Sequence, residues 1–207
     1  MVLLVSVSLF ISCEKPEPDP IPEKTDFVPP TILFATDTVI VDLGSIADAL
    51  KGVTVTDDVD GPIDAITVNA NLDVIGNTQV EYVAIDKAGN KAVAKRVATV
   101  RSGKLARNYR VMFGSGYSIT VTEQDIVNVA ITGFHFNLRA VCEPDGAGKL
   151  KIRQFQSADG GDTYVYAGDV RYEKVGDAYN IVHVTYTRHT IENPDNVETI
   201  DVECRLD

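Results

Sequence analysis

The chain has 207 residues and carries 30 Asp and Glu against 19 Lys and Arg, which gives a formal net charge of −11 at pH 7. So acidic a chain is a poor candidate for binding nucleic acid, because the phosphate backbone attracts clustered cations. We therefore expect no nucleic-acid partner. The length is enough for one large domain or two small ones.

Residues 2–11 form an apolar run that two serines interrupt. The run is shorter than the roughly 20 residues that span a bilayer, but it suits the apolar core of a secretory signal. It departs from the usual pattern in that no Lys or Arg precedes it. The segment FISC at 10–13 resembles the lipobox, the processing site of bacterial lipoproteins. The resemblance implies that residues 1–12 are a signal peptide and that Cys13 carries a lipid that anchors the protein in a membrane.

Residues 13–25 are rich in Pro and in acidic side chains. Because Pro and Glu cannot build an apolar core, we expect a solvated tether here. The part at 14–19 (EKPEPD) also resembles the acidic export tags of some Gram-negative lipoproteins. That resemblance implies a lipid-anchored protein of the outer membrane that faces the outside of the cell.

Residues 26–103 are predicted to form a β-sandwich. Short segments rich in Val, Ile and Thr alternate with turns that contain Asp, Asn and Gly, and several such strands in a short stretch are typical of two packed sheets. One segment at 44–50 suits a helical turn, and we place the joint to the rest of the chain at 101–104 (RSGK). The predicted strands are 31–35, 38–42, 53–56, 65–69, 78–86 and 91–101.

Two motifs in this part of the chain are specific. VTDDVDG at 55–61 and VEYVAIDKAGN at 80–90 occur in that order after PPTI at 29–32. Together they resemble the pattern of bacterial immunoglobulin-like domains related to the hyalin repeat. The resemblance covers residues 26–101. It implies a Greek-key immunoglobulin-like sandwich that works as a spacer, adhesion or recognition module and has no catalytic site.

Four aspartates lie within these motifs, Asp57, Asp58, Asp60 and Asp86. Carboxylate oxygens are the ligands that Ca²⁺ prefers, and neighbouring acids repel one another unless a cation lies between them. One interpretation is therefore a calcium site, although the spacing is not that of an EF-hand loop. The other is that each carboxylate caps a turn through backbone N–H groups. We expect no other cofactor.

Residues 104–207 are predicted to form a second β-rich domain, with no family motif that we recognise. Its strands alternate, as at 182–187, where Val182, Val184 and Tyr186 oppose His183, Thr185 and Thr187. This alternation indicates antiparallel strands with one solvated face. A second antiparallel β-sandwich and a flattened barrel both satisfy the pattern. The fold class is therefore all-β throughout.

Cys142 and Cys204 each lie in an alternating apolar series, and the first series begins at Phe134 and includes Phe136. Alternation with a period of two places both thiols on the buried face of a strand. Exported proteins meet oxidising conditions, so a disulfide between these cysteines is one interpretation. Two buried free thiols are the other, because cysteine packs well in a core.

Tyr164 and Tyr166 lie two residues apart, next to a Gly–Asp turn that contains Asp162, and Tyr172 shares their parity. An exposed row of tyrosines beside acids can stack on a sugar ring while the carboxylates bind its hydroxyls. In that case these residues form a ligand site. The alternative is that the tyrosines form the buried face of an ordinary strand.

We find no catalytic motif. The three histidines do not form H-E-x-x-H, and neither a nucleophile elbow nor a P-loop is present. We therefore expect a non-enzymatic cell-surface lipoprotein whose immunoglobulin-like spacer presents a distal β-domain that binds a glycan or a protein. The alternative is a structural or adhesion component of the envelope that acts through protein–protein association.

Overall fold

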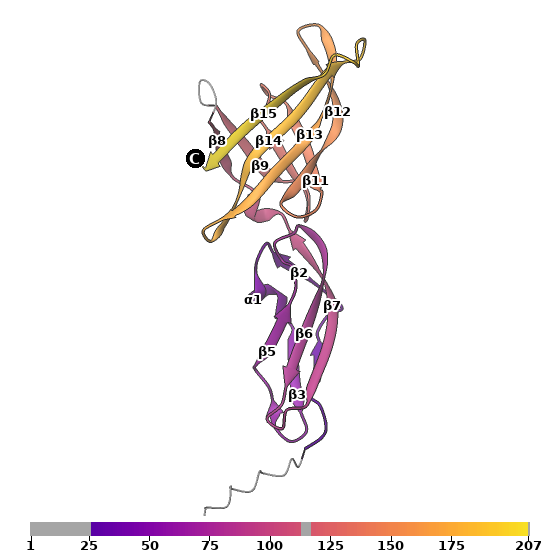
Figure 1. Cartoon of the computed structure of the whole chain (residues 1–207), viewed down its shortest axis with the longest axis vertical. Helices are drawn as coiled ribbons and strands as arrows, with labels where there is room; N and C mark the ends of the chain where they lie inside the picture. The colour runs from indigo at the N-terminus through magenta and orange to yellow at the C-terminus, as the bar shows by residue number, and fades with distance from the viewer. Residues whose placement is uncertain (1–25, 113–116, 207) are drawn as a thin grey trace, which may run out of the picture.

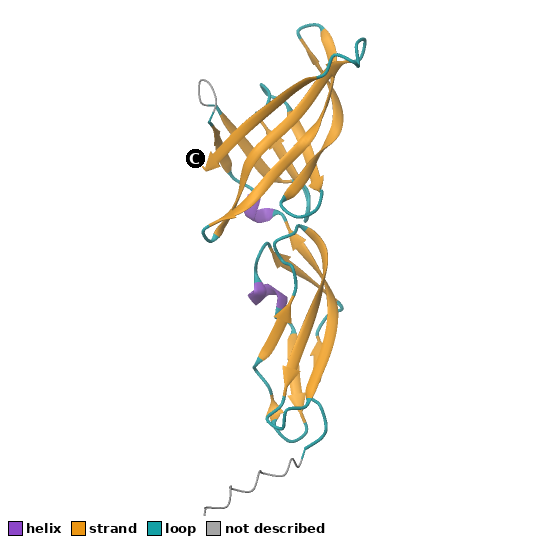
Figure 2. Ribbon diagram, viewed as in Figure 1, coloured by secondary structure: helices purple, strands orange, loops and turns teal. Residues whose placement is uncertain are grey.

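The computed structural model describes residues 26–112 and 117–206. Their regular secondary structure is almost entirely β-strand, with one short α-helix and one 3₁₀ turn (Figure 2). None of the described helices is both long enough and apolar enough to cross a membrane. The predicted signal peptide, the lipidation site Cys13 and the tether lie outside the described residues.

The N-terminal unit consists of two β-sheets (Figure 1). One has the order β1-β3-β4 and the other the order β2-β7-β6-β5, in which only the β2–β7 pair is parallel. The rings of Phe34 and Tyr82, one from each sheet, pack with centroids 5.0 Å apart. The elements are β1 (Thr31–Phe34), β2 (Thr38–Asp42), α1 (Ile46–Ala49), β3 (Val53–Asp57), β4 (Gly61–Pro62), β5 (Ile66–Asn69), β6 (Gly76–Ile85) and β7 (Lys91–Arg101).

A buried arginine fixes α1 to the sheets. Arg96 is 5% exposed, and its Nη2 donates to the carbonyl oxygens of Ala49 at 2.6 Å and Lys51 at 2.9 Å. Its Nε donates to Tyr82 Oη at 3.0 Å, and Tyr82 Oη donates in turn to the Ala49 carbonyl at 2.6 Å. The guanidinium also lies over the rings of Phe34 and Tyr82. The buried charge is therefore neutralised by carbonyl dipoles and aromatic faces rather than by an acid.

The C-terminal unit is a closed, up-and-down antiparallel barrel. Each strand pairs with the next in sequence, and β15 pairs with β8 to close the ring. Of the two predicted alternatives, the barrel is the one that forms. Its strands are β8 (Asn108–Val111), β9 (Ser118–Glu123), β10 (Val129–Thr132), β11 (Arg139–Pro144), β12 (Lys149–Asp159), β13 (Asp162–Val175), β14 (Ala178–Thr190) and β15 (Glu198–Leu206).

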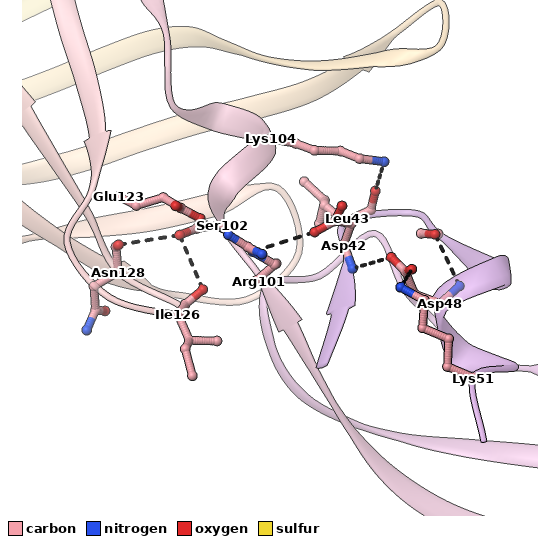
Figure 3. Close-up of polar contacts among 11 residues, drawn as sticks. Asp42, Leu43, Asp48, Lys51, Arg101, Ser102, Lys104, Glu123, Ile126 and Asn128 are labelled. Atoms are coloured by element: carbon pink, nitrogen blue, oxygen red, sulfur yellow. Dashed lines mark hydrogen bonds and ion pairs between the residues drawn. The ribbon is translucent and has the colours of Figure 1, made fainter. Parts of the chain in front are cut away.

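A tight joint connects the two units (Figure 3). After β7 the chain makes the 3₁₀ turn η1 (Gly103–Leu105) and enters the barrel. Ser102 is fully buried, and its N–H donates to the Ile126 carbonyl at 3.0 Å in the β9–β10 connection. Lys104 Nζ donates to the Leu43 carbonyl at 2.7 Å. Buried apolar side chains of both units belong to one continuous cluster, so the two units meet through a shared core.

Candidate functional site

The candidate site lies at the end of the barrel that faces away from the N-terminal unit. In an up-and-down barrel, successive connections alternate between the two ends. The β9–β10 connection contacts the joint, so the β10–β11 connection lies at the opposite end (Figure 1). A pocket of ≈ 570 Å³ opens there. Its lining combines aromatic and polar side chains: Tyr117, Ser118, Gly133, Phe134, His135, Phe136, Asn137 and Tyr186.

Phe136 is the most exposed large apolar side chain of the described residues, at 77%. It is also the one non-glycine residue among them with a positive φ, at 47°. A bulky residue is rarely found in this left-handed conformation, which costs about 1–3 kcal/mol. The β10–β11 connection thus holds an aromatic ring in solvent against both a conformational and a solvation cost.

The floor of the pocket is a hydrogen-bonded chain through His135. Arg188 Nη1 lies 3.0 Å from His135 Nε2, and since a guanidinium can only donate, Nε2 must accept. The ring proton is therefore on Nδ1, which donates to Tyr186 Oη at 2.9 Å. Burial, followed by the charge of Arg188, lowers the pKa of His135, while Asp159 opposes this shift. Burial raises the pKa of Tyr186 to about 12.

Arg188 organises the polar side of this end of the barrel. Its Nε donates to Glu198 Oε2 at 2.6 Å, and its Nη1 lies 3.3 Å from Asp159 Oδ2. The guanidinium also lies over the ring of Tyr164, 5.0 Å from its centroid. Two acids and one aromatic face thus hold the arginine that fixes the tautomer of His135.

The exposed tyrosine row proposed as a ligand site does not form. Tyr166 is fully buried, and its ring stacks on Phe155 with centroids 5.2 Å apart. Tyr164 is half-buried beneath Arg188, and Asp162 is an exposed residue of the β12–β13 hairpin. Tyr166 points into the barrel because closure turns this face of β13 inwards. Its Oη has no hydrogen-bond partner among the described residues, so a buried polar atom remains unsatisfied near the pocket.

The predicted calcium ligands divide into two groups. Asp57 and Asp86 lie close together and share their cluster with Asp26, a residue that we did not predict. Asp58 is exposed. Asp60 interacts with Lys87 instead. The backbone N–H of Lys87 donates to Asp60 Oδ2 at 2.6 Å, and Lys87 Nζ forms an ion pair with Asp60 Oδ1 at 3.2 Å. Asp58 and Asp60 therefore do not belong to the cluster.

Cys142 and Cys204 are free thiols, and both are buried. They lie on β11 and β15, strands that are not neighbours in the barrel, so the disulfide interpretation does not hold. Burial raises the pKa of each thiol to about 12. Thiols with so high a pKa are poor nucleophiles, and their role is that of small core residues.

No family model matches the chain, and no curated protein matches it. Among solved structures, the crystal structure of a lipoprotein from Bacteroides thetaiotaomicron is similar, with 13% sequence identity, a TM-score of 0.32 and coverage of 85% of this chain and 99% of that chain. The functional assignment of this chain therefore depends on its own residues.

Proposed function

We propose that this protein is a non-enzymatic lipoprotein of the cell surface, in which an immunoglobulin-like spacer carries a glycan-binding barrel. Cys13 anchors it in the outer membrane, and the segment after Cys13 leads to Asp26. The molecule is elongated (Figure 1). The pocket is lined by residues of the β10–β11 connection, at the end of the barrel away from the N-terminal unit. This order of anchor, spacer and binding site holds the pocket away from the membrane and towards ligands outside the cell.

The observation that carries the proposal is the strained, exposed Phe136 at the rim of an aromatic pocket. The C–H face of a sugar ring packs well on aromatic side chains, while its hydroxyls need polar partners at the edges. Tyr117 and Phe136 supply aromatic rings, and Asn137 supplies an amide that both donates and accepts. The pocket volume lies within the range of about 300–1,000 Å³ that is usual for small-molecule sites.

The hydrogen bonds of His135 favour binding over catalysis. A general base needs a ring nitrogen that is available to the substrate. Both nitrogens of His135 are already occupied, one by Tyr186 and the other by Arg188. His135 therefore acts as a structural part of the pocket floor.

A second candidate function is association with an envelope protein, as the alternative from the sequence suggests. It is favoured by exposed apolar residues on one face of the β2-β7-β6-β5 sheet, where Ile40, Val93 and Val97 are 52%, 50% and 42% exposed. Charged residues such as Lys95 and Glu81 interrupt this surface. It is less concentrated than the aromatic rim of the barrel, which is why we place it second.

The test is a glycan-array screen of the secreted protein from Glu14 onward, followed by calorimetric titration of each positive glycan. We expect Phe136→Ala to weaken binding about five- to tenfold, because one stacked aromatic ring contributes about 1 kcal/mol. Val175→Ala is the matched control. Val175 is also exposed, at 56%, but it lies at the end of the barrel near the joint, so its loss should leave affinity unchanged.

Two outcomes contradict the glycan proposal. One is that no glycan on the array binds a folded sample. The other is that Phe136→Ala and Val175→Ala bind as tightly as the wild type. Either result would favour association through protein partners, and cross-linking on intact cells would then compare Phe136→Ala with Val97→Ala.

A further inference from the structure

Three buried carboxylates from separate segments meet at the end of the N-terminal unit that lies opposite the barrel. Asp26 lies ahead of β1, Asp57 ends β3, and Asp86 follows β6. One oxygen atom from each carboxylate lies within 4.8 Å of those of the other two. The residues are only 6%, 9% and 6% exposed, respectively. Three like charges are therefore held together where water can screen them little.

Hydrogen bonds from the backbone orient these carboxylates. Asp57 Oδ1 accepts from the N–H groups of Val59 at 3.0 Å and Asp60 at 2.9 Å. Asp26 Oδ1 accepts from the N–H of Val28 at 2.9 Å. Asp86 accepts from Asn90, from the backbone N–H at Oδ1 and from the side-chain amide at Oδ2, each at 2.7 Å. Each side chain is thus fixed in place, as in a preformed ligand site.

The cluster lacks a counter-charge among the residues that the structure describes. No Lys, Arg or His forms an ion pair with Asp26, Asp57 or Asp86, and the nearby Lys87 pairs with Asp60 instead. Asp26 Oδ2 and Asp57 Oδ2 are buried and have no hydrogen-bond donor. A buried carboxylate oxygen without a donor or a cation is strongly unfavourable. A cation bound between the three carboxylates removes both defects.

We propose that Asp26, Asp57 and Asp86 bind one Ca²⁺ ion. Three carboxylates without a cysteine or histidine form an oxygen-only set, which suits a hard cation rather than zinc or copper. An ion with Ca–O distances of about 2.3–2.6 Å can reach all three oxygens at their observed spacing. Mg²⁺ usually retains several water ligands, and the burial of this cluster leaves little room for them.

The ion would fasten the start of the folded chain to the spacer. Asp26 brings in the segment that leads from the predicted tether, whereas Asp57 and Asp86 belong to the body of the unit. Asn90 supports the same connection, because its Nδ2 lies 3.3 Å from the carbonyl oxygen of Asp26 and 3.1 Å from that of Val28. Calcium thereby makes the attachment between tether and spacer firm. This inference concerns the N-terminal unit and does not depend on what the barrel binds.

The test uses the protein from Glu14 onward after removal of metal with a chelator. Calorimetric titration with CaCl₂ should show one site, and MgCl₂ should bind at least tenfold more weakly, because Mg²⁺ gives up its water ligands reluctantly. At a Ca²⁺ concentration of 100 times Kd, we expect Tm to rise by about 5–10 °C. Absence of calcium binding, or Mg²⁺ binding of equal affinity, would overturn the proposal.

The ligand set is tested with Asp57→Asn and its neighbour Asp58→Asn. The amide at position 57 keeps an acceptor for the N–H groups of Val59 and Asp60 but loses the charge, so calcium affinity should fall on the order of 100-fold. Asp58→Asn makes the same charge change on an exposed residue outside the cluster and should change affinity less than about twofold. An equal loss of calcium affinity in the two variants would contradict the assignment of Asp57 as a calcium ligand.

The Tm of the metal-free variant distinguishes the loss of a calcium ligand from misfolding. Because Asp57→Asn relieves repulsion in the cluster, its metal-free form should unfold at or above the Tm of the metal-free wild type. Hydrogen exchange supplies a local readout. Calcium should slow exchange at the N–H groups of Val28, Asp60 and Asn90, which donate to the proposed ligands, and leave exchange in the barrel unchanged. A lower metal-free Tm for Asp57→Asn would contradict the idea that charge repulsion dominates the cluster.

Discussion

His135 is the residue whose protonation should change the stability of the pocket. Its Nε2 accepts from Arg188, so a proton added there would face the guanidinium directly. The charged groups around it are Arg188, Asp159 and Glu198, and the phenols of Tyr186 and Tyr166 lie on its other sides. Burial and Arg188 together outweigh the acids and lower the pKa of His135 below its ordinary value.

We predict an acid-side loss of stability that depends on His135. Above the unfolded-state pKa of about 6.5, histidine is neutral in both states and contributes nothing. As the pH falls below that value, the unfolded chain takes up a proton that the folded chain resists, so the free energy of unfolding decreases. Urea unfolding at pH 7.5 and 5.5 measures this loss. The loss should be smaller in His135→Gln than in the wild type, and an equal loss of stability in both proteins would refute the prediction.

Strand β13 lies beside a bulge in β12. The β12–β13 register shifts between Ile152 and Phe155, opposite the segment that contains Gly168. A Cβ at Gly168 would collide with the backbone of β14, at the Thr185 carbonyl and 2.6 Å from Tyr186 Cα. Glycine and the bulge together let the strands coil tightly enough to close a small barrel.

We predict that Gly168→Ala destabilises the barrel by about 2–4 kcal/mol, because the backbone of two paired strands would have to separate. Asp169→Ala on the same strand is the control. Asp169 is exposed, so its substitution should change the free energy of unfolding by less than about 0.5 kcal/mol. Equilibrium unfolding in urea compares the two variants. A loss in Gly168→Ala no larger than in Asp169→Ala would mean that the strands can shift without cost.

The elements themselves were largely predictable from the sequence, because alternation and turn residues are local signals. The predicted strand at 91–101 coincides with β7, and the all-β class and the barrel alternative are confirmed. Alternation identifies the residues that share a face of a strand but not whether that face is exposed to solvent. It therefore could not decide whether Tyr166 lies in an exposed ligand site or on a buried face. It also extended the β11 series back to Phe134 and Phe136, whereas β11 begins at Arg139 and the preceding residues form a connection.

The candidate sites were less predictable, since they depend on contacts between distant parts of the chain. Asp26 joins Asp57 and Asp86 although it lies outside both motifs. The partners of His135 come from β14, which is remote in sequence. The aromatic run at Phe134–Phe136 was the one local signal for the pocket, and we interpreted it as part of a buried strand.

At the scale of the whole molecule, the joint should make the two units move as one body. Gly44 has a φ of 73°, and a Cβ there would lie 2.9 Å from Tyr179 Cε2 in the barrel. Tyr179 Oη donates to Asp73 Oδ1, and Tyr172 Oη lies 3.3 Å from the backbone nitrogen of Ile75, so the barrel is held against the β5–β6 connection. A side chain at position 44 would displace Tyr179 and separate the barrel from the N-terminal unit.

We predict that Gly44→Ala weakens the joint and that Gly61→Ala does not. Gly61 has the same φ of 73°, but no atom lies within 4 Å of the place that an alanine Cβ would occupy, so both variants carry the left-handed backbone cost of about 1 kcal/mol. Gly44→Ala should cost about 1–3 kcal/mol more because it displaces Tyr179. Residual dipolar couplings should fit one alignment tensor in the wild type and Gly61→Ala, and two in Gly44→Ala. A single alignment tensor in the wild type and in both variants would show that Gly44→Ala does not weaken the contact between the two units.

Closure of the barrel by its last strand also sets the order in which the molecule can fold as it is synthesised. The N-terminal unit is complete once Arg101 has emerged, because β7 then pairs with β2 and β6. The barrel must wait for β15, since Cys204 pairs with Val111 and Leu206 pairs with Tyr109. The N-terminal unit can therefore fold while the barrel is still an open meander of hairpins. Without β15, a folded N-terminal unit would be attached to an open barrel whose β8 and β14 edges are unpaired.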